Sequence, residues 1–470
     1  MANRNPELCG LNPFFDPQSI AVIGSLKEGY FGGYVVVKTL LKAGFTGKIY
    51  PVNPSYREVL GKKVYASIKD VPGKIDLALI IIGCRAVPGV LRECGEKGIR
   101  AVVVVSDGFA ERDEEGAKLQ REIIEIARQT GIRIIGPNTA GIANPKKGLI
   151  PNPYEMGYEK VKEGPIAICA QTGMVNPQAF PYGDLHYGVS KLCDFGNKAD
   201  VDECDMMEYL ESDPATKTIA LYLESIKDGQ RFLKVSKRVN SKKPILILKS
   251  GRTEQGARVS ASHTGSLALN DRIFDAACKQ SGIIRLESFR ELFELPKIFA
   301  YQPLPKGNRL GIITFTGGVG VLAIDEGAKY GLFVPLLSPR TRKKLDAIFP
   351  GLGKRIVDIG PPMAVVNNYM SIYSEILKTV AIDPCIDSIF NVIWTGPSGE
   401  FVEEYLKIYR GFQGNPKPIA SWIYGPRVHY VNEMTCQLED MGFPVFPDIE
   451  MAIKALGKAS QYAKTKGGNR

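Results

Sequence analysis

The stretch SIAVIGSLKEGYFGG, residues 19–33, decides how this chain begins to fold. Residues 20–23 form an unbroken apolar run, and Gly24 ends it. A short apolar run bounded by glycine is typical of a strand that is buried on both faces of a parallel sheet. GYVVVKTLLKAG, residues 33–44, then has the pattern of a helix, and GKIYPVNP, residues 47–54, contains a second strand. Together these segments predict a βαβ unit.

The same alternation continues along the whole chain. It restarts after two segments rich in Pro, Gly and polar residues, 144–164 and 302–308, which we interpret as linkers. At 470 residues the chain has room for about three domains of ~150 residues each. We therefore predict three consecutive doubly wound α/β domains, at residues 1–147, 160–302 and 306–470. Further strands are predicted within residues 75–83, 100–109, 132–138, 165–173, 188–200, 217–226, 244–253, 283–288, 309–315, 387–396, 417–425 and 443–448.

Composition and charge indicate the class of protein and the kind of partner that it suits. The chain is 44% hydrophobic and 23% charged, and its formal net charge is +10, which suits anionic partners. RTRKK at residues 340–344 is short and reads as part of a helix, so we do not expect nucleic acid as a partner. No apolar run approaches ~20 residues and the N-terminus lacks the apolar core of a signal peptide. We expect a soluble, cytoplasmic protein that does not interact with membranes.

The nine cysteines form no CxxC pair. Several lie in apolar runs such as PIAICAQ at residues 165–171, which is typical of buried, reduced thiols in a reducing compartment. Neither His186 nor His429 lies at zinc-ligand spacing from a cysteine pair. We expect no metal site in this chain.

Ligands of open α/β sheets bind beyond the carboxyl ends of the strands, so the loops that follow the strands are the candidate sites. GSLKEGYFGG, residues 24–33, could bring backbone N–H groups close to a phosphate at the start of a helix; the alternative is a purely structural turn. It has neither the GxGxxG spacing nor the Gly-Lys-Ser/Thr of a P-loop. PVNP at residues 51–54 has no acid to hold a ribose, which counts against a nicotinamide oxidoreductase.

Three further features suggest phosphoryl chemistry. Thr172 and Gly173 follow a predicted strand and could present a hydroxyl and N–H groups to an anion. Glu224 lies near the end of another strand, where it could orient an imidazole or simply pair with a lysine. His263 lies in SASHTGSLAL, residues 260–269, which we expect to be a flexible loop of small residues. A histidine there could be idle, or it could accept a phosphoryl group as a covalent intermediate.

Five motifs give a specific resemblance. They are IIGPNTAGI, GNKADVDECD, YLESIKDG, GKIYPVNP and SHTGSLA, at residues 134–142, 196–205, 222–229, 47–54 and 262–268. In sequence and order they resemble the alpha subunits of the NDP-forming acyl-CoA synthetases, which include ADP-forming acetyl-CoA synthetase and are related to succinyl-CoA synthetase. The resemblance runs from about Leu11 to Ala463.

The resemblance implies a Rossmann-like CoA-binding domain followed by two flavodoxin-like ligase domains. It implies that His263 is the phosphorylated residue and that Glu224 is its partner. Residues that match the phosphate-binding positions are Thr172, Gly173, Met174, Thr264 and Gly265. Residues that match the CoA-binding positions are Gly24, Ser25, Lys27, Asn53, Pro54, Gly83, Ser106 and Asn138.

The resemblance also implies a reaction and a partner. The reaction is the reversible conversion of acyl-CoA, ADP and phosphate into a carboxylic acid, ATP and CoA, through an acyl phosphate and a phosphohistidine. We expect no ATP-grasp domain in this chain, so ADP or ATP with Mg²⁺ is expected on a separate ATP-grasp beta subunit, in an alpha2beta2 assembly. Gly251, Gly256 and Gly265 would let the histidine segment travel between the two sites.

Three departures from the family pattern stand out. Gln171-Thr172-Gly173-Met174 replaces the usual Gln-Ser-Gly-Ala, and Met174 is expected to line the acyl pocket. FTGGVG at residues 315–320 replaces Asn-Ala-Gly-Gly-Pro-Gly, and Arg355–Asp358 replace Asn-Pro-Val-Asp, which affects contacts of the third domain. These changes keep open a second hypothesis, a CoA- or nucleotide-binding regulatory protein without turnover.

Overall fold

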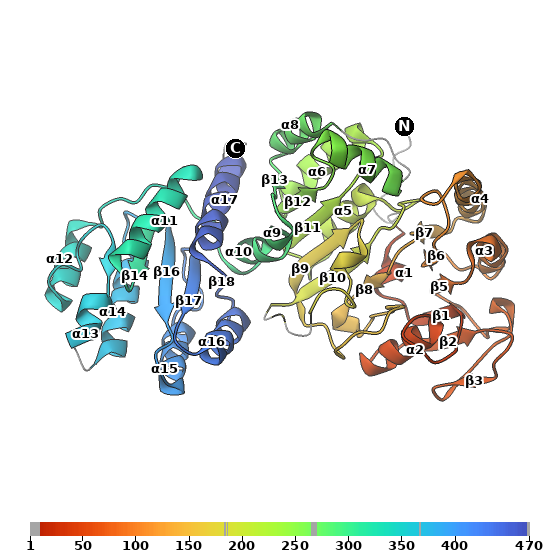
Figure 1. Ribbon diagram of the computed structural model, residues 1–470, viewed down its shortest axis with the longest axis horizontal. Coiled ribbons are helices and arrows are strands. Elements are labelled where there is room, and N and C mark those ends of the chain that lie inside the picture. The colour runs from red at the N-terminus through yellow and green to blue at the C-terminus, as the bar shows by residue number, and fades with distance from the viewer. Residues whose placement is uncertain (1–9, 183–184, 186, 265–269, 366–367, 468–470) are drawn as a thin grey trace. The chain divides into compact units, whose positions relative to one another are not determined.

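The computed structural model describes residues 10–182, 185, 187–264, 270–365 and 368–467, with residues 260–264 described through their backbone alone. The chain divides into two compact units, Met1–Ser288 and Phe289–Arg470. Within the described residues there are three large sheets, each flanked by helices, and a two-stranded sheet formed by β3 (Glu58–Val59) and β4 (Lys62–Lys63) (Figure 1). The prediction of successive doubly wound α/β sheets is confirmed.

The first sheet is fully parallel, and its strand order is β2-β1-β5-β6-β7. All six residues of β1 are buried, as the unbroken apolar run predicted. Helices α2 (Gly33–Lys42), α3 (Val87–Glu96) and α4 (Glu114–Thr130) connect the strands. The strands are β1 (Ser19–Gly24), β2 (Lys48–Val52), β5 (Leu77–Ile81), β6 (Ala101–Val104) and β7 (Arg133–Ile135).

The second sheet has the order β13-β12-β11-β9-β10-β8. Its strand β8 (Ile142–Ala143) comes from the segment after the first sheet and pairs antiparallel with β10 (Val189–Asp194). The sequence does not predict this edge strand, because two residues are too few to form an apolar pattern. The other strands are β9 (Glu163–Ala170), β11 (Thr218–Leu223), β12 (Ile245–Lys249) and β13 (Ile284–Arg285). The helices are α5 (Glu203–Ser212), α6 (Gly229–Asn240), α7 (Glu254–Thr264) and α8 (Asp271–Ser281).

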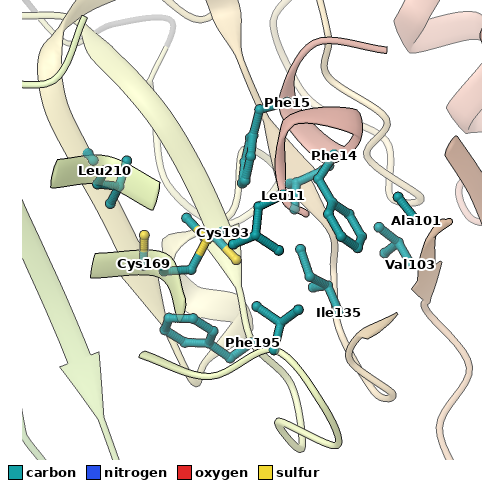
Figure 2. Close-up of a cluster of buried hydrophobic side chains, with 14 of the residues drawn as sticks. Leu11, Phe14, Phe15, Ala101, Val103, Ile135, Cys169, Cys193, Phe195 and Leu210 are labelled. Carbon is teal, nitrogen blue, oxygen red and sulfur yellow. The ribbon is translucent and has the colours of Figure 1, made fainter. Parts of the chain in front are cut away.

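The first two sheets share a hydrophobic core. Figure 2 shows Leu11 and the two phenylalanines of α1 (Asn12–Phe15) between Val103 and Ile135 of the first sheet and Cys193 and Phe195 of the second. All of these side chains are buried. The first two predicted domains therefore pack against each other within one compact unit.

The stretch expected to be a linker, residues 144–164, is packed against the first unit instead. Leu149 and Ile150 are buried, and the carbonyl oxygen of Pro153 accepts the N–H of Gly32 at 2.8 Å. Lys38 of α2 pairs with Glu155 at 3.0 Å. A polar, Pro-rich composition predicts an irregular backbone, but it does not predict exposure.

The second unit is built on the fully parallel sheet β15-β14-β16-β17-β18. Its strands are β14 (Leu310–Thr314), β15 (Val357–Asp358), β16 (Ser388–Trp394), β17 (Ile419–Tyr424) and β18 (Val445–Phe446). Its helices are α9 (Phe289–Glu294), α10 (Pro296–Tyr301), α11 (Gly317–Lys329), α12 (Pro339–Ile348), α13 (Gly360–Val365), α14 (Tyr369–Ala381), α15 (Gly399–Arg410), α16 (Val428–Asp440) and α17 (Ile449–Gly467).

Two buried ion pairs attach α9 and α10 to this second unit. Lys297 pairs with Glu439 at 2.7 Å, and Lys454 pairs with Glu291 at 2.9 Å. Residues 289–301, which we assigned to the second predicted domain, are thus bound to helices α16 and α17 of the second unit. Long-range charge pairing of this kind leaves no local signal in the sequence.

Eight of the cysteines are described, and each is a free thiol. Five of them are buried, as predicted, and burial raises the pKa of Cys94 to about 12. None of the helices in the described ranges is both long and apolar enough to cross a membrane.

Candidate active site

A cavity of about 1150 Å³ opens beyond the carboxyl ends of the first sheet. The strand order reverses between β1 and β5, which is the point where doubly wound sheets bind their ligands. Residues from the loops after all five strands line the cavity. Seven of the eight residues predicted to bind CoA are among them: Gly24, Ser25, Asn53, Pro54, Gly83, Ser106 and Asn138. The cavity exceeds the roughly 300–1,000 Å³ of typical small-molecule pockets, so it suits an extended ligand.

The eighth predicted residue, Lys27, is exposed and is not among the residues that line this cavity. The charged residues that do line it are all acidic: Glu93, Asp107 and Asp194. A phosphate that enters this cavity would therefore have to be held by N–H groups. Helix α2 begins at Gly33 without a side-chain cap, close to Ser25. Tyr34 in its first turn already donates its N–H to the carbonyl oxygen of Ser25 at 3.2 Å, which leaves the N–H groups of Gly33 and Val35 as candidates.

Two polar side chains fix the strand ends around the cavity. Asn53 donates from Nδ2 to the carbonyl oxygen of Gly24 at 2.8 Å and accepts the N–H of Ser55 at 2.9 Å, which ties the end of β2 to the end of β1. Ser106 donates to the carbonyl oxygen of Ile82 and accepts the N–H of the same residue at 3.2 Å. Both residues were predicted from the family resemblance, and both shape the cavity through backbone contacts.

The motifs IIGPNTAGI and GNKADVDECD lie side by side. The N–H groups of Asn197, Ala199 and Val201 donate to the carbonyl oxygens of Pro137, Gly136 and Ile134, respectively, at 2.9, 2.9 and 3.0 Å. Arg133 adds charged contacts with Asp200 and Asp205, each at 2.8 Å. Two motifs about sixty residues apart therefore form one structural feature, which joins the large cavity to the second sheet.

The predicted phosphate-binding turn follows β9. Thr172 caps the short helix η5 (Gly173–Val175) and accepts the N–H of Met174 on its hydroxyl at 3.3 Å. Thr172 and Gly173 line a smaller cavity of about 160 Å³, together with Asn138, Gln171, Asp194, Gly196 and Asn197. Gly173 and Asn138 also line the large cavity, so the two cavities adjoin. Met174 is 55% exposed and is not among the lining residues of either cavity, contrary to our expectation.

Glu224 follows β11, and its backbone is held by Gln171, which directly precedes the predicted phosphate-binding turn. Buried Gln171 accepts the N–H groups of Glu224 and Ser225 on Oε1 at 2.9 and 3.1 Å. Lys198, whose side chain is 1% exposed, donates to the carbonyl oxygen of Ser225 at 2.6 Å and pairs with Glu203 at 2.8 Å. Burial raises the pKa of Tyr222, and the nearby charge of Glu224 raises it further.

His263 lies on α7, near its C-terminal end, and not in a loop as expected. The helix begins after Thr253, whose hydroxyl accepts the N–H of Gly256 at 3.1 Å. A threonine N-cap followed by Glu254 is a sequence signal for a helix start, and it could have predicted this helix. Thr264 ends α7, while Gly265 lies outside the described residues.

Several other residues of the site were not predicted from the sequence. Gln171, Asn197 and Asp194 line the smaller cavity, and Tyr154 lines the larger one from the stretch expected to be a linker. Gln171 and Asn197 lie inside quoted motifs, so each could have been found there. His186 lies outside the described residues. In the part of the chain that the structure describes, no group of three or more His, Cys, Asp or Glu could hold a metal ion.

Two known families match successive parts of the chain. Residues 18–145 match the family described as CoA binding domain. Residues 163–299 match the succinyl-CoA ligase like flavodoxin domain. Most of the residues that line the large cavity lie in the first of these segments, while the predicted phosphate-binding turn, Glu224 and His263 lie in the second.

Whole-length relatives carry consistent names. The alpha subunit of ADP-forming acetate–CoA ligase II from Pyrococcus furiosus is 38% identical, covering 97% of this chain and 99% of its own. ADP-forming acetate–CoA ligase II from Archaeoglobus fulgidus is 37% identical over 97% of this chain, which spans 67% of that protein. A solved structure of dinucleotide-forming acetyl-coenzyme A synthetase 1 from Ca. Korarchaeum cryptofilum, in complex with phosphate and ADP, aligns with a TM-score of 0.87 at 30% identity, covering 98% of each chain. The chain therefore belongs to the ADP-forming acyl-CoA ligase family, whose alpha subunit it matches over almost all of its length.

Proposed function

We propose that this chain is the catalytic alpha subunit of an ADP-forming acyl-CoA ligase that works through a phosphohistidine at His263. The observation that supports this most is the large cavity, which seven of the eight predicted CoA-binding residues line and which adjoins the cavity at Thr172 and Gly173. A thioester in the first cavity and a phosphate in the second would lie next to each other. That proximity is what acyl transfer to phosphate requires.

The proposed chemistry has two steps on this chain. A phosphate oxygen attacks the thioester carbonyl, the carbon–sulfur bond breaks, and CoA leaves as the thiol once its sulfur is protonated. An imidazole nitrogen of His263 then attacks the phosphorus of the acyl phosphate, the phosphorus–oxygen bond breaks, and the carboxylic acid leaves. N–H groups at Gly173 and the charge of Glu224 suit the positioning and charge balance on which phosphoryl transfer depends.

The remaining step needs a second chain. We propose that ADP, with Mg²⁺, binds to an ATP-grasp beta subunit in an alpha2beta2 assembly, and that its terminal phosphate oxygen attacks phosphohistidine to give ATP. The reverse sequence would activate the carboxylic acid. The buried free thiols fit a cytoplasmic enzyme.

Labelling tests the proposal. The chain is purified with its partner subunit and incubated with γ-labelled ATP, or with acyl-CoA, ADP and labelled phosphate. We expect acid-labile, base-stable label on this chain that disappears in His263→Ala. His429→Ala is the matched control, because His429 lies in the second unit, and it should keep the label. If the wild-type complex forms no phosphohistidine from either donor, the proposed mechanism is wrong.

A further inference from the structure

One buried carboxylate joins the two cavities. Asp194 ends β10, is 3% exposed, and is the charged residue common to the linings of the large and the small cavity. No lysine or arginine lines either cavity within the described part of the chain. Burying a carboxylate without a cation beside it costs free energy of folding. The presence of Asp194 at this position therefore needs a physical reason.

Its hydrogen bonds reach both sides of the site. Oδ2 accepts the N–H of Ala140 at 2.8 Å, from the loop that lines the large cavity, and Nδ2 of Asn176 at 3.3 Å, just after the phosphate-binding turn. Oδ1 accepts the N–H of Gly196 at 3.1 Å, in the lining of the small cavity. Thr139 donates to the backbone carbonyl of Asp194 at 2.6 Å. All three partners of the carboxylate are donors, and an ionised carboxylate is the side chain that only accepts.

We propose that Asp194 is a positioning residue of the ligase reaction, which as a carboxylate holds the CoA-cavity wall at Thr139–Ala140 in line with the phosphate-binding segment at Gly173–Asn176. This inference rests on the proposed function. The inference deepens the proposed function because it names the group that aligns the thioester with the phosphate. Burial raises the pKa of Asp194 to about 6, so the charge that serves this alignment also costs stability at neutral pH.

Asp194→Asn tests the proposal because it preserves shape and removes the charge. The NH₂ group of the new asparagine must then face one of the three donors. At least one of the three hydrogen bonds is therefore broken. At pH 8 we expect the Kd of the full chain for CoA, by calorimetry, and the KM of the complex for phosphate each to rise roughly tenfold. The melting temperature should stay level or rise, because a buried charge has been removed. Asp16→Asn, which removes a surface carboxylate in the same unit, should change none of these values.

Asn176→Ala separates the role of Asp194 on the phosphate side of the site from its role on the CoA side. It removes the contact on the phosphate side and leaves Ala140 hydrogen-bonded to Asp194. We expect a higher KM for phosphate with an unchanged Kd for CoA. Equal loss of both affinities would contradict an alignment role.

The pH profile gives an independent measurement. The other titratable groups near Asp194 are Cys193 beside it, Cys169 across the strand pair, Asp107 and Tyr154 in the large cavity, and Glu111, which contacts Asn197. Burial raises the pKa of Cys169, Cys193 and Tyr154, which keeps all three neutral near pH 6. CoA also titrates in this range, so the informative quantity is the ratio of the variant and wild-type Kd values. That ratio should fall from roughly ten at pH 8 toward one at pH 5, because protonated Asp194 resembles the amide.

Two results would overturn the inference. In one, Asp194→Asn binds CoA and phosphate as the wild type does. In the other, it melts well below the wild type and the ratio of Kd values does not change with pH, which would mark a structural role. Phosphohistidine formation from ATP in the wild-type complex is measured in parallel. If that fails, the proposed function is wrong, whereas if it succeeds and the Asp194 variant is unaffected, this inference alone is wrong.

Discussion

Gln171 Oε1 accepts the backbone N–H of Glu224 at 2.9 Å, and this hydrogen bond joins the predicted phosphate-binding turn to the predicted partner of His263. The same oxygen accepts the N–H of Ser225 at 3.1 Å. Gln171 follows β9 and Glu224 follows β11. These two strands are neighbours, and their carboxyl ends lie at one edge of the sheet. The position of Glu224 is therefore set by a side chain fifty-three residues earlier.

Gln171→Leu removes the acceptor of both N–H groups. We expect the free energy of unfolding of the first unit to fall by about 2–4 kcal/mol, because buried N–H groups lose their partner. Phosphohistidine formation should slow by roughly tenfold or more as Glu224 loses its fixed position. Urea denaturation and rapid-quench labelling measure the two effects. Gln171→Glu keeps an acceptor oxygen, and its stability should lie closer to that of the wild type; equal stability of both variants would contradict this explanation.

Lys198→Met leaves Glu203 charged and buried without its partner. Both side chains are 1% exposed, so we expect a loss of about 3–5 kcal/mol in the free energy of unfolding. The double variant Lys198→Met/Glu203→Leu should recover much of this loss, because an apolar pair has no charge to solvate. Chemical denaturation of the two variants measures the difference. A double variant that is less stable than Lys198→Met would contradict the prediction.

Gly196→Ala tests the pairing of the two motifs. Gly196 has φ +53°, and a Cβ there would lie 2.2 Å from the carbonyl oxygen of Pro137. We expect a loss of more than about 2 kcal/mol and weaker CoA binding, because the motifs must separate to admit the methyl group. Gly229→Ala is the control: nothing lies within 4 Å of its Cβ position, at the start of α6, and the change should be neutral or slightly stabilising. Thermal melts of both variants measure the change in stability, and CoA titrations measure the change in CoA affinity.

The raised pKa of Asp194 has a consequence for the dependence of stability on pH. The folded chain binds this proton more tightly than the unfolded chain, whose aspartates titrate near 3.9. The stabilisation of the folded chain by the proton bound to Asp194 is thus fully present below about pH 4. It is lost as pH rises through the folded pKa of about 6. Relative to Asp194→Asn, the wild type should lose on the order of 3 kcal/mol between pH 4 and pH 7. Denaturation curves of both proteins across this range measure it, and parallel curves would show that Asp194 does not titrate there.

Much of the candidate site could be predicted from sequence, because it lies in loops directly after apolar runs. Gly24, Asn53 and Ser106 follow buried strands, and the structure brings them to one cavity. Lys27 also follows a strand, yet it lies outside the lining, since proximity in sequence to a strand end does not fix the direction of a side chain. His263 was expected in a loop because its neighbours are small, but the Thr253 cap starts a helix that includes it.

By itself the sequence determined the parallel strands of the three sheets and the loops at their carboxyl ends, because a strand buried on both faces must be a continuous apolar run. It also determined the family, through motifs that are contiguous in the chain. Only the tertiary structure decided that IIGPNTAGI pairs with GNKADVDECD, that residues 144–164 are packed against the first unit, and that Asp194 meets Ala140 and Asn176. These contacts join residues far apart in the chain, and the order of strands in the sheets, which no local pattern encodes, places them together.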